Sequence, residues 1–163
     1  AAVPALAASI QAQAVTGLVG YSLGGLIALQ ALQQHPGLPV TTLVCLGTPL
    51  SGSQTARQLC QLRLGRLLGR SGQLLGQAQQ LGTGAVRIGQ VAGNRPFGLG
   101  RLLGAQGRDS DGTVGLAETH WPGLAGHCVV PATHTGLPFN RQAAGQVVHF
   151  LRNGCFVPGV APG

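Results

Sequence analysis

Short apolar runs along the chain alternate with longer segments in which apolar residues recur at helical spacing. Most of these runs are rich in β-branched residues and bounded by glycine or proline, which is typical of buried strands. The pattern predicts strands at residues 15–20, 40–46, 85–92 and 127–131. It predicts helices at residues 1–13, 23–34 and 140–152. Strands that alternate with helices favour an α/β fold, with a mostly parallel sheet flanked by helices on both faces.

Two further segments bear on the domain organisation. Residues 53–81 carry leucines among arginines and glutamines, and we expect a helical insertion there, between the second and third strands. The apolar window 14–32 is uncharged, but glycines and a Tyr-Ser pair interrupt it, so two short elements explain it better than a membrane helix does. A length of 163 residues fits one domain, which we expect to span residues 1–163.

Composition excludes several classes of protein. With 44% hydrophobic and 8% charged residues, the chain has too much apolar content for a disordered tail. Its formal net charge of +7 reflects a scarcity of acidic residues rather than a dense basic block, and aromatic residues make up only 4%. Nucleic-acid binders usually cluster their charge and add stacking aromatics, so we expect no nucleic-acid partner.

The cysteines and the start of the chain bear on metal binding and location. Cys45, Cys60, Cys128 and Cys155 lie far apart without a CxxC pair, so we expect isolated buried thiols and no metal site. Free thiols suit a reducing compartment. No basic segment precedes an apolar stretch, so no signal peptide is recognisable. We therefore expect a cytoplasmic location.

The segment GYSLG at residues 20–24 fits the G-x-S-x-G pattern and lies between a predicted strand and a predicted helix. A serine on such a turn has a strained backbone that holds its hydroxyl clear of the sheet, and the flanking glycines allow strand and helix to pack closely. Ser22 is therefore the expected nucleophile, and the Leu23 N–H at the helix start is the expected oxyanion donor. The alternative is a glycine-rich turn with an incidental serine.

A serine hydroxyl needs a base, and a serine on such a turn is followed along the chain by an acid and then a histidine. Asp111, which precedes a glycine, is the expected acid, with Asp109 and Glu118 as the alternatives. An aspartate in such a loop also commonly forms an Asx turn. His134 follows the last predicted strand and is the expected base. Structural or solvated roles are expected for His35, His120, His127 and His149.

Four blocks of sequence together resemble a known superfamily. They are GYSLGG (20–25), LGTPLSGS (46–53), SDGTV (110–114) and HTGLPF (134–139). In this order they are similar to blocks of the bacterial lipase or esterase-like branch of the α/β-hydrolase superfamily, over about residues 15–156. The resemblance implies Ser22 as nucleophile, Asp111 as orienting acid and His134 as general base. It also implies hydrolysis of small-molecule or lipid carboxylic esters through an acyl-enzyme, with no metal or organic cofactor.

The chain differs from this family at its N-terminal end. Only 21 residues precede Ser22, and they hold no His-Gly motif of the kind that supplies a second oxyanion donor in the family. We therefore expect an N-terminally truncated hydrolase whose strand at residues 15–20 has an exposed edge open to self-association. The alternatives are a non-catalytic remnant with an incomplete oxyanion hole, and an acyltransferase or thioesterase on the same fold.

The segment at residues 57–70 places arginines among leucines. In the family this region tends to form a cap over the active site, and a cap helix with a solvated arginine face is expected. The alternative is a weak contact with an anionic membrane surface, because basic amphipathic helices can lie on such surfaces.

Overall fold

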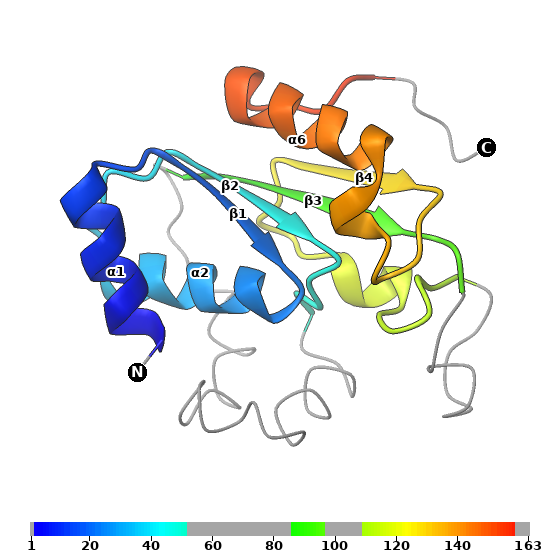
Figure 1. Ribbon diagram of the computed structural model, residues 1–163, viewed down its shortest axis with the longest axis horizontal. Coiled ribbons are helices and arrows are strands. Elements are labelled where there is room, and N and C mark those ends of the chain that lie inside the picture. The colour runs from blue at the N-terminus through cyan, green and yellow to red at the C-terminus, as the bar shows by residue number, and fades with distance from the viewer. Residues whose placement is uncertain (1, 52–85, 97–108, 159–163) are drawn as a thin grey trace.

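The computed structural model describes residues 2–51, 86–96 and 109–158. Its centre is a parallel four-stranded sheet in the order β1-β2-β3-β4 (Figure 1). The strands are β1 (Gly17–Tyr21), β2 (Thr42–Leu46), β3 (Arg87–Gly93) and β4 (Gly126–Val130). The helices α1 (Ala2–Gln13) and α2 (Leu23–Gln34) lie on one face, and α6 (Arg141–Asn153) lies on the other. The predicted α/β fold is confirmed.

The strand β2 is buried on both faces at every position, as its continuous apolar sequence predicts. Side chains alternate across a sheet, so Leu43 and Cys45 pack with the helices α1 and α2. Val44 and Leu46 point the other way and pack with α6, whose Phe150 is fully buried. The single sheet thus separates two apolar layers, one under each set of helices.

The helix α6 has well-defined ends. The Asn140 side chain accepts a hydrogen bond of 2.9 Å from the Ala143 N–H, which caps the first turn. At the other end Gly154 adopts a φ of 72°, a left-handed conformation that commonly ends helices. These caps fix α6 just beyond the loop that carries His134.

The strand β1 lies at an edge of the sheet, because its only paired neighbour is β2 among the strands that the structure describes. Val19 is 49% exposed and Tyr21 is 36% exposed. The interpretation of residues 15–20 as a buried strand is therefore wrong for the side chain of Val19. The side chains of an edge strand have a neighbouring strand on one side only, so they are less covered than those of β2.

Most predicted elements are found with shifts of one or two residues at their ends. The window 14–32 contains β1 and α2 rather than one long helix, as expected. None of the described helices has the length and apolar character needed to span a membrane. The predicted helical insertion at residues 53–81 and its membrane contact lie outside the described residues and stay predictions. Two short 3-10 helices were not predicted: η5 (Leu116–Thr119) and η6 (Leu137–Phe139).

Candidate active site

The carboxyl ends of all four parallel strands meet at one edge of the sheet, and the expected site residues lie there. Ser22 directly follows β1, and Gly47 directly follows β2. Asp111 lies in the connection between β3 and β4, and His134 follows β4. The topology therefore gathers side chains that are more than a hundred residues apart in the sequence.

Ser22 occupies a strained turn between β1 and α2. Its φ is 51° and its ψ is −119°, a region that residues other than glycine rarely adopt. Two hydrogen bonds to β2 and the loop after it help to hold this backbone in place. The Ser22 N–H donates to the Leu46 carbonyl at 2.8 Å, and the Ser22 carbonyl accepts from Thr48 Oγ1 at 3.0 Å. The neighbouring strand β2 and its loop thus stabilise the turn that presents the hydroxyl.

Close packing behind this turn depends on two glycines. A β-carbon on Gly20 would lie 2.5 Å from the Gly25 Cα, and one on Gly25 would overlap the Thr48 side chain. At Gly24, by contrast, a β-carbon would meet nothing within 4 Å. We expected a close-packing role for both flanking glycines, but of these two only Gly20 has one, and Gly25 is its partner in the helix.

The structure brings Ser22, His134 and Asp111 into one hydrogen-bonded path. His134 Nε2 lies 3.0 Å from Ser22 Oγ, and His134 Nδ1 lies 2.7 Å from Asp111 Oδ2. All three side chains are largely buried, and Asp111 is only 1% exposed. An ionised carboxylate can only accept hydrogen bonds, so Nδ1 donates to Asp111 and Nε2 accepts from the serine hydroxyl.

Asp111 is held by its own loop. Its Oδ1 accepts hydrogen bonds from the N–H groups of Thr113 at 2.9 Å and Val114 at 2.7 Å. The aspartate thus forms the Asx-type turn and also meets His134, so these two interpretations are compatible. Of the two alternatives, Asp109 is exposed, and the Glu118 carboxylate accepts from the Gly115 N–H at the start of η5.

Gly47 makes room for the contact between His134 and Asp111, and sequence reasoning missed it. Its φ is 54°, and a β-carbon there would lie 3.1 Å from His134 Nδ1 and 3.2 Å from Asp111 Oδ2. The Gly-Thr-Pro sequence after β2 indicated a loop, but not which side chains would fill the space beside its glycine.

Tyr21 is a second residue that sequence reasoning missed. Its hydroxyl donates a hydrogen bond of 3.1 Å to the His134 carbonyl, and its ring lies 5.1 Å from the imidazole between centroids. Burial and, to a smaller extent, the negative charge of Asp111 raise the pKa of the Tyr21 hydroxyl above its usual value. The phenol therefore stays protonated and can donate this bond at neutral pH.

The backbone N–H of Leu23 is available beside the serine. Leu23 is the first residue of α2, and the N–H groups of a first helical turn have no partner within the helix. Such a group can stabilise negative charge that develops on an oxygen. Together with Ser22, His134 and Asp111, it makes an arrangement that could supply a nucleophile, a base, an orienting acid and one oxyanion donor.

The remaining histidines of the sequence analysis lie elsewhere. The rings of His120 and His127 stack with centroids 3.9 Å apart, and His127 Nε2 lies 2.8 Å from Thr119 Oγ1. Burial, with a smaller contribution from His120, lowers the pKa of His127 to about 4. His149 lies within α6 and meets the Cys155 carbonyl through Nδ1, and His35 ends α2.

The cysteines only partly match the expectation of buried thiols. Cys45 is buried, and this burial raises its pKa to about 12. Cys128 is half-buried, with a pKa raised by burial to about 11. Cys155 is exposed just beyond α6, so the expectation is wrong there. Cys60 lies outside the described residues.

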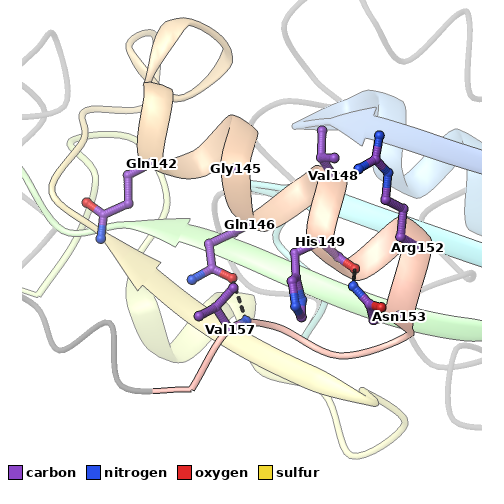
Figure 2. Close-up of a pocket in the computed structure, with 8 residues that line it drawn as sticks. All are labelled: Gln142, Gly145, Gln146, Val148, His149, Arg152, Asn153 and Val157. Carbon is purple, nitrogen blue, oxygen red and sulfur yellow. Dashed lines mark hydrogen bonds between the residues drawn. The ribbon is translucent and has the colours of Figure 1, made fainter.

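A groove of about 470 Å³ runs along α6 and is lined by none of the site residues. Figure 2 shows its walls, which include His149, Arg152 and Val157. The Val157 N–H donates to Gln146 Oε1 at 2.9 Å and closes one side of the groove (Figure 2). The groove thus lies apart from the serine, histidine and aspartate.

Two solved structures share this fold, both of the lipase BlEst2 of Bacillus licheniformis. The mature form matches with a TM-score of 0.57 and 23% identity, covering 82% of this chain and 66% of that one. The propeptide form matches with a TM-score of 0.57 and 24% identity, covering 82% of this chain and 36% of that one. No protein-family model and no curated protein sequence matches the chain. The chain thus has an α/β fold similar to that of a lipase and spans less than two thirds of that lipase's length in each form.

Proposed function

We propose that this chain is a serine hydrolase of the lipase or esterase type, which cleaves carboxylic esters through an acyl-enzyme. The observation that carries the proposal is the path from Ser22 Oγ to His134 Nε2 at 3.0 Å and from His134 Nδ1 to Asp111 Oδ2 at 2.7 Å. The strained turn under Ser22 and the lipase-like fold support it. The substrate is a small-molecule or lipid ester.

The first half of the reaction transfers the acyl group to the serine. Ser22 Oγ attacks the carbonyl carbon while its proton passes to His134 Nε2, and the π electrons of the carbonyl move onto its oxygen. Asp111 stabilises the imidazolium, and the Leu23 N–H stabilises the oxyanion. As the tetrahedral intermediate collapses, the bond to the leaving alkoxide breaks and the alcohol takes the proton from Nε2.

The second half of the reaction hydrolyses the acyl-enzyme and regenerates the Ser22 hydroxyl. A water gives its proton to His134 Nε2 and attacks the acyl carbon, forming a second tetrahedral intermediate. The bond between this carbon and Ser22 Oγ then breaks, and Oγ recovers the proton from Nε2. The carboxylic acid leaves, so one ester and one water give one acid and one alcohol.

The test is labelling by a fluorophosphonate together with hydrolysis of p-nitrophenyl butyrate. We expect stoichiometric labelling of the wild type, none of Ser22→Ala, and a loss of kcat of at least about 10³-fold in that variant. Ser51→Ala is the matched control, because Ser51 is another serine near a strand end and its side chain is exposed. Circular dichroism checks that each variant is folded.

Labelling that persists in Ser22→Ala would remove Ser22 from the mechanism. A folded wild type that is neither labelled nor active would favour the non-catalytic alternative. Faster transfer of the acyl group to an added alcohol than to water would favour an acyltransferase. A preference for thioesters over esters would favour a thioesterase.

A further inference from the structure

We propose that Tyr21 is a positioning residue that fixes the His134 imidazole over Ser22, and this rests on the proposed function. Tyr21 donates a hydrogen bond of 3.1 Å from its hydroxyl to the His134 carbonyl, and its ring packs 5.1 Å from the imidazole at a tilt of 36°. The sequence separation is 113 residues, so this contact ties the histidine loop directly to the strand that carries the nucleophile.

Five hydrogen bonds hold His134, and Tyr21 supplies the one that comes neither from the triad nor from the loop of the histidine itself. Its N–H donates to the Asp111 carbonyl at 2.8 Å, Nδ1 meets the Asp111 carboxylate, and Nε2 meets Ser22. Its carbonyl accepts from the Tyr21 hydroxyl at 3.1 Å and from the Leu137 N–H of the same loop at 3.3 Å. The Leu137 bond lies within the histidine loop and moves with it, so the Tyr21 bond is the one that ties the carbonyl side of His134 to β1.

The position of Tyr21 makes this contact specific. Tyr21 is the last residue of β1 and immediately precedes Ser22, so any shift of the turn moves the hydroxyl and the nucleophile together. The bond therefore keeps the distance between His134 Nε2 and Ser22 Oγ constant when the turn that carries Ser22 shifts. A misplacement of about 1 Å between reacting groups can cost about 10²-fold in rate, so a contact of this kind affects turnover more than substrate binding.

The test compares Tyr21→Phe, which removes the hydroxyl and keeps the ring, with Tyr21→Leu, which removes both. Thr41→Val is the matched control, because Thr41 Oγ1 also donates to a distant carbonyl, that of Thr16, at the opposite end of the sheet. For Tyr21→Phe we expect kcat on p-nitrophenyl butyrate and the fluorophosphonate labelling rate to fall about five- to tenfold, with KM within about twofold. Tyr21→Leu should lose more, and Thr41→Val should match the wild type.

A second readout does not depend on hydrolysis. The His134 Nδ1 proton, which is shared with Asp111, should give a slowly exchanging proton NMR signal in the wild type and in Thr41→Val. In Tyr21→Phe this signal should broaden and exchange faster with water. Wild-type kinetics and an unchanged signal in Tyr21→Phe would overturn the proposal, as would a rise in KM without loss of kcat. A wild type that is neither labelled nor active contradicts the proposed function instead, and the NMR signal still decides the role of Tyr21.

Discussion

At the residue scale, the site depends on side chains whose orientation other groups impose. Asp111 has little freedom, because Oδ1 is occupied by two backbone N–H groups and only Oδ2 faces His134. Gly47 leaves the space in which this contact forms. Preorganised groups of this kind need little rearrangement when charge develops on the imidazole.

The matched pair Asp111→Asn and Asp109→Asn tests the role of this carboxylate. In Asp111→Asn a neutral amide replaces the charge that stabilises the imidazolium, and the amide can orient the wrong tautomer. We expect kcat on p-nitrophenyl butyrate to fall about 10³- to 10⁴-fold. Asp109 is exposed, so Asp109→Asn should change kcat little. A larger loss in Asp109→Asn than in Asp111→Asn would show that the assignment is wrong.

At the scale of elements, the contact between β1 and α2 sets the geometry of the turn that carries Ser22. Gly20 and Gly25 let the strand and the helix approach each other closely, and the Thr48 side chain fills the remaining space beside Gly25. Thr48 also donates to the Ser22 carbonyl, so packing and the strained turn are linked through one side chain. A side chain added at Gly25 would therefore displace Thr48 and disturb the Ser22 turn, whereas one added at Gly24 would not.

Gly25→Ala and Gly24→Ala test this link with the same chemical change at adjacent positions. The new β-carbon at position 25 overlaps Thr48, and overpacking of this kind costs about 1–3 kcal/mol of unfolding free energy. At position 24 the β-carbon meets open space, and alanine favours a helix over glycine by up to about 1 kcal/mol. Denaturation by urea measures the unfolding free energy of each variant. Equal unfolding free energies for the two variants would contradict the packing argument.

At the scale of the whole molecule, one sheet with helices on both faces supports the site, and among the described residues no strand pairs with the outer edge of β1. The edge strand β1 exposes Val19 and Tyr21, so self-association through this edge stays a prediction. Stability also depends on groups far from the site. The half-buried His127, stacked on His120, is one of them.

The stability of the fold should fall as the pH is lowered through the range in which His127 titrates. Its pKa is about 4 in the folded chain against an ordinary value of 6.5. Between these values the unfolded chain binds a proton that the folded chain excludes, so acid favours unfolding. We expect the unfolding free energy to decline from pH 6.5 to pH 4, and to decline less in His127→Gln. If the unfolding free energies of the wild type and of His127→Gln declined equally with falling pH, His127 would not be the cause.

Much of the fold followed from local patterns, and less of the site did. The apolar run of β2 and the helix after Ser22 are local signals, and both elements lie where they were predicted. The edge position of β1 in the described sheet agrees with the expectation, but the burial of its side chains was overestimated, because a run of apolar residues does not reveal which of them a helix covers. Tyr21 and Gly47 could not have been singled out, because their roles depend on contacts with His134, which is distant in sequence.

The order of strands in the sheet has a consequence for the timing of assembly. Each strand pairs with the strand before it in the chain, so the sheet can grow in one direction as the polypeptide is synthesised. Ser22 and its turn depend on β1, α2 and β2, which leave the ribosome before β3 and β4 do. His134 and α6 come after β4 and join the described sheet after it. The elements that hold Ser22 thus precede its partner His134 along the chain, and the contact between the two can form only after synthesis has passed residue 134.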